Sequence, residues 1–147
     1  MAETTIITGK EYEPDLEKNI KSVLGKRVLA ANNEHTGRVK DVICSTNKIE
    51  GIIVDGKSFT VFIDFGHIRD LYSKSVFLKI DPIVRYLGMT VFDEEGKRLG
   101  KVVELEQEQN TNELKNIIIR KGILSKKQSI SVKRIDTDKK NIILKKQ

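Results

Sequence analysis

Short apolar runs separated by polar turns extend along almost the whole chain, and this arrangement occurs twice. Leu24-Gly25 returns 63 positions later as Leu87-Gly88, and Gly37-Arg38-Val39 returns at the same offset as Gly100-Lys101-Val102. Such a repeat indicates two copies of one structural unit. Each copy has roughly 60 residues, a size at which one hydrophobic core is marginal. We therefore expect the two units to pack against each other or against a second copy of the chain.

Within each copy, the length and alternation of the apolar runs are typical of β-strands. They predict strands at 27–30, 38–45, 49–54, 59–65 and 75–80 in the first copy, and at 89–92, 98–105, 114–119, 129–132 and 141–144 in the second. Short strands with closely spaced turn signals indicate an all-β fold of two tandem small β-barrels, each closed on itself. The apolar triplets at 52–54 and 117–119 predict strands that are covered on both faces.

The turn between the first two strands of each copy has one position that favours a positive φ. Gly96 holds this position in the second copy, and Asn33 holds it in the first. Glycine adopts such angles without steric cost, and asparagine is the next most tolerant residue. We therefore expect the same turn geometry in both copies.

The N-terminal part of the chain has a different pattern. Residues 1–22 are expected to form a flexible tail with a short helix, because Leu16, Ile20 and Val23 have helical spacing within the segment from Asp15 to Leu24. The expected domains are then residues 23–82 and residues 83–147.

The repeated residues resemble the opening pattern of the PRC-barrel family, in which Leu-Gly-x-x-Val is followed by a turn with glycine and then Gly-x-Val. The first copy has Leu24-Gly25, Val28, Gly37 and Val39, and the second has Leu87-Gly88, Val91, Gly96, Leu99-Gly100 and Val102. The resemblance covers about residues 23–147. It departs from the family pattern in the first copy, which lacks the turn glycine, and in the second, which has a longer polar loop at 107–113.

This resemblance implies a six-stranded barrel that serves protein–protein contact and has no catalytic role. In archaea, stand-alone members resemble adaptors of the FtsZ-based division machinery, which link its membrane-anchoring component to other factors. We therefore expect a non-enzymatic intracellular adaptor for other proteins, with possible self-association as a dimer and recruitment to the division site or membrane through a partner. The alternative is a ribosome-maturation or RNA-processing factor that binds ribosomal protein or RNA, because the same domain also occurs at the C-terminal end of a ribosome-maturation factor.

The basic charge is concentrated in the second copy. Residues 85–147 carry fifteen Lys or Arg against nine Asp or Glu, whereas residues 1–23 carry three against five. A basic surface attracts nucleic acid, anionic lipid or an acidic partner. The candidate patch consists of Lys97, Arg98, Lys101, Arg120, Lys121, Lys126 and Lys127. Aromatic residues on which bases could stack are scarce here, so we expect nucleic acid to be the less favoured partner.

A candidate protein-binding residue lies in the aromatic segment 59–65. Strand alternation predicts a core face formed by Phe59, Val61, Ile63 and Phe65. Phe62 then points outward between Thr60 and Asp64. An outward Phe on a barrel is expected to be covered by the N-terminal helix, by the other barrel or by a partner. Phe62, Thr60 and Asp64 are therefore the candidate partner-binding residues.

We predict no catalytic, cofactor-binding or metal-binding residue. His35 is expected to lie in an exposed turn. His67 is near Asp64 and Asp70 in the sequence, but the chain has no nucleophile elbow of the kind that hydrolases use. Two isolated histidines and one cysteine do not supply the three or four ligands of a metal site.

Cys44 and the hydropathy pattern bear on the compartment. A single cysteine excludes an internal disulfide and suits a reducing compartment. Its apolar neighbours predict a buried thiol. The chain shows no secretory signal and no apolar stretch of the ~20 residues that a membrane span needs. We therefore expect a cytoplasmic protein without a transmembrane segment.

Overall fold

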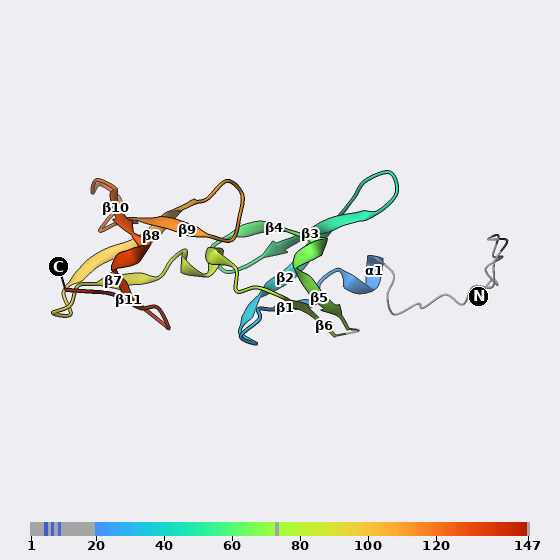
Figure 1. The fold of residues 1–147 in the computed structure, drawn as a ribbon, viewed down its shortest axis with the longest axis horizontal. Coiled ribbons are helices and arrows are strands. Elements are labelled where there is room, and N and C mark those ends of the chain that lie inside the picture. The colour runs from blue at the N-terminus through green and yellow to red at the C-terminus, as the bar shows by residue number, and fades with distance from the viewer. Residues whose placement is uncertain (1–4, 6, 8, 10–19, 73, 147) are drawn as a thin grey trace.

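The computed structural model describes residues 5, 7, 9, 20–72 and 74–146, which form two barrel-like halves arranged end to end (Figure 1). The first half contains α1 (Ile20–Val23), β1 (Arg27–Leu29), β2 (His35–Cys44), β3 (Ile49–Asp55), β4 (Thr60–Asp64), η2 (Phe65–His67), β5 (Ile68–Leu71) and β6 (Ser75–Leu78). The second half contains η3 (Ile83–Tyr86), β7 (Thr90–Phe92), β8 (Arg98–Gln107), β9 (Leu114–Arg120), β10 (Gln128–Ser131), η4 (Val132–Arg134), β11 (Ile135–Thr137) and β12 (Ile142–Leu144). Here η denotes a short 3-10 helix.

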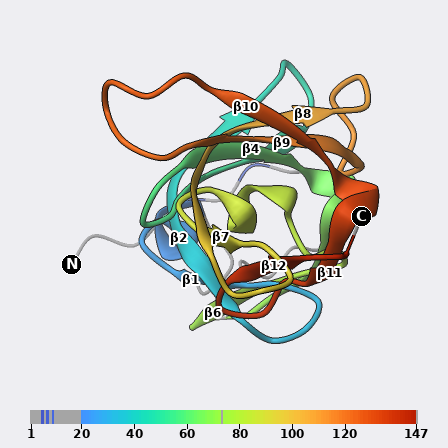
Figure 2. The same ribbon diagram turned by 90° about the vertical axis from the view of Figure 1, so that its left-hand side faces the viewer.

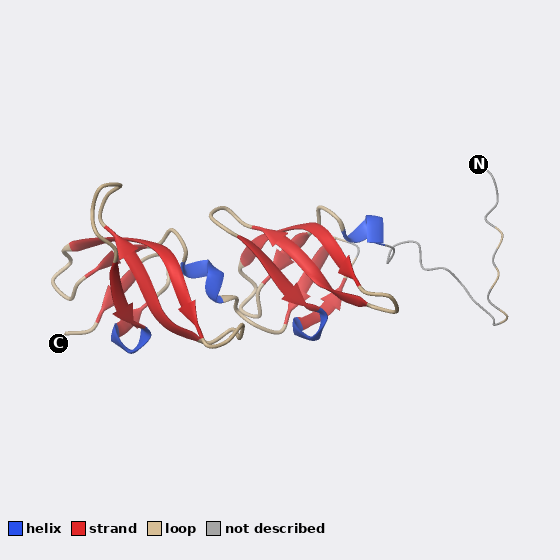
Figure 3. Cartoon of the chain, turned by 90° about the horizontal axis from the view of Figure 1, so that it is seen from above, coloured by secondary structure: helices blue, strands red, loops and turns tan. Residues whose placement is uncertain are grey.

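The two halves have the same topology. The strand order is β4-β3-β2-β1-β6-β5 in the first sheet and β10-β9-β8-β7-β12-β11 in the second. The pairs β1–β6 and β7–β12 are parallel, and the other pairs are antiparallel. Along the sequence β2 and β8 alternate between exposed and buried residues in the same way. The strands of each half curl into a barrel-like sheet, which Figure 2 shows along the long axis and Figure 3 from above. The all-β tandem fold predicted from the sequence is confirmed.

Each barrel has its own apolar core. Val28, Ile52, Val54 and Leu78 are among the buried residues of the first core, and Val91, Ile117, Ile119, Ile142 and Leu144 are among those of the second. All three residues of the apolar triplet 117–119 are buried, including Ile118, as predicted for a strand covered on both faces. In the triplet 52–54 of the first copy, Ile53 is only half-buried, so the prediction of a strand covered on both faces was wrong for this strand.

The predicted turn geometry is confirmed. Asn33 has a φ of 68° and Gly96 a φ of 86°. The glycines that follow the turns have a different role, because the neighbouring strand passes close to them. A Cβ on Gly37 would lie 2.2 Å from the carbonyl oxygen of Asp55, and one on Gly100 would lie 2.6 Å from that of Arg120. The repeated glycine therefore allows β2 and β8 to pack closely against β3 and β9.

Each barrel has one strand more than the alternation predicted. The additional strands are β5 and β11, which have four and three residues and interrupt their apolar positions with charge, such as Arg69 and Asp136. Of the predicted N-terminal helix, the structure shows α1. Residues 15–19 lie outside the described residues, as does most of the predicted tail.

The hydrogen-bonded ladder of each barrel is open at one seam. The outermost strands of the first sheet, β4 and β5, do not pair with each other, and the turn η2 connects them. The outermost strands of the second sheet, β10 and β11, are connected by η4 in the same way. Each barrel therefore has a free strand edge, which the prediction of closed barrels did not include.

Candidate functional site: the junction between the barrels

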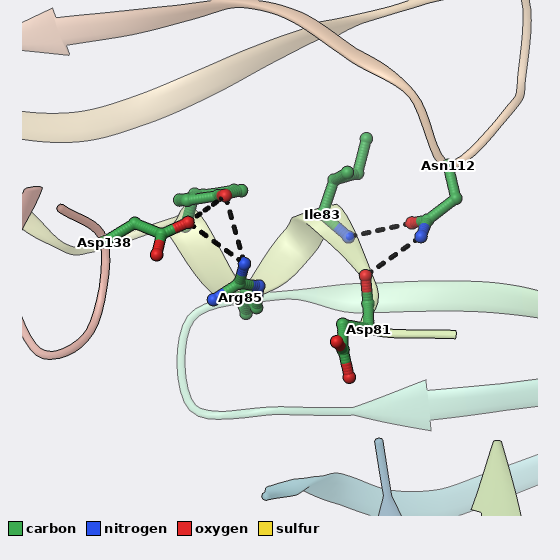
Figure 4. Close-up of polar contacts among 6 residues, drawn as sticks. Asp81, Ile83, Arg85, Asn112 and Asp138 are labelled. Carbon is green, nitrogen blue, oxygen red and sulfur yellow. Dashed lines mark hydrogen bonds and ion pairs between the residues drawn. The ribbon is translucent and has the colours of Figure 1, made fainter. Parts of the chain in front are cut away.

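The segment Asp81–Ile83, which joins the barrels, is held from both sides, and Figure 4 shows its hydrogen bonds with Asn112. The side-chain oxygen of Asn112, in the β8–β9 loop, accepts a hydrogen bond from the Ile83 N–H at 2.9 Å. The Asn112 amide nitrogen donates to the carbonyl oxygen of Asp81, also at 2.9 Å. From the first barrel, the Asn32 N–H donates to the Asp81 carboxylate at 2.9 Å. The linker is therefore tied to a loop of each barrel.

The turn η3 closes one end of the second barrel. Ile83 and Tyr86 are buried in the second core. Arg85 lies 4.5 Å from the centre of the Tyr86 ring and forms an ion pair with Asp138 at 3.1 Å. The Tyr86 hydroxyl donates to the same carboxylate. Burial, together with the hydrogen bond to Asp138, raises the pKa of Tyr86 to about 12.

A groove of about 560 Å³ lies between β4, the linker and the β8–β9 loop. We call it the β4 groove. Its lining includes Val61, Phe62 and Ile63 from β4, Pro82 from the linker, and Asn110 and Thr111 from the loop. Asp64 and His67 line one part of it, and their side chains contact each other. Of the predicted partner-binding residues, Phe62 and Asp64 therefore line this groove at the junction. Thr60 lies outside the lining, and its hydroxyl donates to the Asp55 carboxylate at 2.7 Å.

Phe62 has the orientation that the alternation predicted. Its side chain is 48% exposed, whereas Ile63 is 4% exposed. A Cβ on Gly51 would lie 2.8 Å from the Phe62 ring, so the ring lies over the bare backbone of β3. The core assignments of Phe59 and Phe65 were wrong. Phe59 precedes β4 and is half-buried outside the first core. The strand ends at Asp64, and Phe65 begins η2 with 47% of its surface exposed.

A second hollow at the junction, of about 760 Å³, is basic. Its lining includes Lys57 and Phe59 from the first barrel, and Met89, Lys101 and Lys140 from the second. Of the predicted basic patch, Lys101 lines this hollow, and it pairs across the strands with Arg120.

The seven predicted basic residues differ in their surroundings. Lys97, Arg98, Lys121 and Lys126 surround a cavity of about 230 Å³ that is lined entirely by the second barrel. Lys127 instead pairs with Glu104. Arg120 is half-buried, and its buried Nε finds no hydrogen-bond partner among the described residues.

The histidines and the cysteine are surface residues. His35 is exposed at the start of β2. The prediction of a buried Cys44 was wrong, because Cys44 is exposed. It lies in the part of the β2–β3 hairpin that extends past β1, where β2 is paired with β3 but not with β1. Within the described ranges, no three His, Cys, Asp or Glu side chains gather in a way that could hold a metal ion.

The roles of Asn112, Arg85, Tyr86 and Asp138 were not predicted from the sequence. The loop that carries Asn112 has an equivalent in the first copy, where Asn47 occupies the matching position. The asparagine that both copies have at this position was the feature of the sequence that could have indicated a role for Asn112. Among the residues that the structure describes, no helix is long and apolar enough to cross a membrane.

Comparison with known proteins agrees with this architecture. A search of curated proteins finds no match to the chain. The family model described as the PRC-barrel domain matches twice, over residues 16–85 and residues 82–146. Each match corresponds to one six-stranded barrel. The chain therefore belongs to the PRC-barrel domain family, as a protein with two such domains in tandem.

Proposed function

We propose that this protein is a non-enzymatic intracellular adaptor that docks other proteins at the junction of its two barrels. PRC-barrel domains are generally protein-interaction modules and are not catalytic. The observation that supports this proposal is the β4 groove, where the half-exposed Phe62 adjoins elements of both barrels. Half-exposed aromatic residues in a preformed hollow are typical anchors of protein interfaces.

The specific setting that we propose is the FtsZ-based division machinery of an archaeon. There the protein would act from the cytoplasm, and a membrane-anchoring partner would recruit it to the division site. The low aromatic content and the excess of Lys and Ile are compatible with this setting.

Affinity capture from native cells tests the adaptor function. Tagged protein is recovered at moderate salt, with and without nuclease, beside the variants Phe62→Ala and Ser129→Ala. Both variants are first checked for native circular dichroism. We expect division or membrane-anchor proteins that survive nuclease, are lost with Phe62→Ala and are retained with Ser129→Ala. Capture that depends on nucleic acid, or that Phe62→Ala leaves intact, would contradict this proposal.

A second candidate function rests on the basic cavity of the second barrel. Lys97, Arg98, Lys121 and Lys126 present their charges around one hollow, which suits phosphate groups. This supports the alternative of a ribosome-maturation or RNA-processing factor. An electrophoretic shift with RNA at low salt, abolished by the double variant Lys121→Glu and Lys126→Glu, would favour it. The absence of a shift at low salt would exclude it.

A further inference from the structure

The free edge of β4 opens into the β4 groove. The Gly56 N–H donates to the Phe59 carbonyl at 2.9 Å, which makes these two residues a hydrogen-bonded pair at the end of the β3–β4 hairpin. The pairing then continues without a bulge from Thr60 to Asp64. Because bonded and non-bonded pairs alternate in an antiparallel ladder, Val61 and Ile63 direct their N–H and C=O groups toward β3. Thr60 and Phe62 direct theirs toward the free edge.

The shape of the groove is that of a channel beside a strand. It contacts four consecutive residues of β4, from Val61 to Asp64, whose side chains alternate between core and exterior. A hollow on one face of the strand would contact alternate residues. The groove therefore runs along the edge, with the linker and the β8–β9 loop as its opposite wall.

The charge in the groove indicates the kind of segment that fits. Asp64 and His67 are the titratable groups among its described lining residues, and they contact each other. The rest of the lining combines apolar side chains such as Ile80 and Ile83 with the uncharged amides of Gln107 and Asn110. An uncharged, mainly apolar segment is therefore favoured over an acidic or basic one.

The equivalent edge of the second barrel differs in the residues that matter for strand pairing. Ile63 and Ile130 are the equivalent buried residues, because they pair with Ile52 and Ile117. Phe62 then corresponds to Ser129, and Thr60 corresponds to Lys127. Lysine beside an edge strand opposes pairing with another strand, and Lys127 directly precedes β10. β4 has an exposed phenylalanine instead, so its edge is open to addition.

From this geometry we propose that β4 binds an extended, uncharged peptide of a partner protein, which pairs with the free edge as an additional β-strand in the β4 groove. Phe62 inside the groove and Thr60 just beyond its lining would supply the backbone hydrogen bonds, and the Phe62 ring would cover an apolar side chain of the peptide. Strand addition of this kind obtains affinity from the main chain and specificity from alternate side chains. The inference rests on the proposed function and states what docks at the junction.

The probe is a phage-displayed library of short random peptides, selected on the full chain with counter-selection on the Phe62→Lys variant. We expect enriched peptides that are apolar at alternate positions and that protect the Thr60 and Phe62 amides from hydrogen exchange. N-methylation at alternate peptide residues should weaken binding at least tenfold, because it removes main-chain donors. Phe62→Lys should weaken binding similarly, whereas the matched variant Ser129→Lys should not.

Three results would overturn the inference. These are a failure to enrich peptides, protection confined to amides outside β4, and equal weakening by Phe62→Lys and Ser129→Lys. Circular dichroism of both variants separates lost binding from lost folding. The experiments distinguish a failure of this inference from a failure of the adaptor function. If cellular partners are captured equally well by the Phe62→Lys variant, the protein is an adaptor that does not bind by strand addition. If peptides bind β4 but no cellular partner is captured, strand addition occurs but the adaptor function is wrong.

Discussion

The replacement of Asn112 by alanine tests whether the linker is held as the structure shows. The substitution removes the acceptor of the Ile83 N–H and the donor to the Asp81 carbonyl. The net value of one such hydrogen bond is about 1 kcal/mol, and an unsatisfied buried group costs more. Because Asn112 is half-buried, water can replace part of the loss. We therefore expect Asn112→Ala to lower the free energy of unfolding by about 2 kcal/mol.

The internal repeat offers a matched control. Asn47 occupies the equivalent position of the first copy, is exposed, and forms no hydrogen bond with a described residue. Asn47→Ala should change the free energy of unfolding by less than about 0.5 kcal/mol. Urea denaturation followed by circular dichroism measures both values, and hydrogen exchange of the Ile83 amide should accelerate only in Asn112→Ala. If the two substitutions differ by less than about 0.5 kcal/mol, the two hydrogen bonds of Asn112 are not a significant source of stability.

Three further predictions concern the barrels themselves. Gly96→Val should destabilise by about 1–2 kcal/mol because its φ is 86°, whereas Asn33→Gly at the equivalent turn should be nearly neutral in thermal unfolding. Tyr86 has a pKa raised to about 12 from 10.0, so the unfolded chain loses this proton first and stability should fall as the pH rises through that window. Tyr86→Phe should remove this loss at alkaline pH, as measured by urea midpoints. Ile117→Ala should cost about 3 kcal/mol in chemical denaturation, and Ile143→Ala, on the exposed face of β12, should cost less than about 1 kcal/mol.

The sequence predicted features that arise from local patterning. The repeated Leu-Gly and Gly-x-Val elements predicted two related barrels, and the alternation around Phe62 predicted its outward orientation. The matching positions of Asn33 and Gly96 predicted a positive φ in both turns. Each of these features follows from neighbouring residues and the strand period, which a sequence records directly.

The errors and omissions concern features that depend on distant parts of the chain. Cys44 has apolar neighbours, but its exposure depends on how far β2 extends beyond β1. Phe65 continues the alternation in the sequence, although the strand has already ended. The contacts of Asn112 with the linker join residues about 30 positions apart. The domain limits at residues 22 and 82, and the binding roles of Phe62 and the basic residues, stay predictions.

The differences between the two copies are concentrated at positions that the shared fold leaves free to vary. Both barrels need the close-packed Gly37 or Gly100, and both retain it. On the edge strands, by contrast, the pair Gly51 and Phe62 of the first barrel corresponds to Asn116 and Ser129 in the second. The large ring occurs in the copy whose neighbouring strand has a glycine at the diagonal position, so the Phe62 ring can lie over Gly51. Although the two barrels share one fold, the first therefore has an apolar strand edge at the junction, and the second has a polar strand edge beside a basic cavity. If the duplication separated two binding tasks, exchanging Phe62 and Ser129 should transfer peptide binding only when Gly51 and Asn116 are exchanged as well.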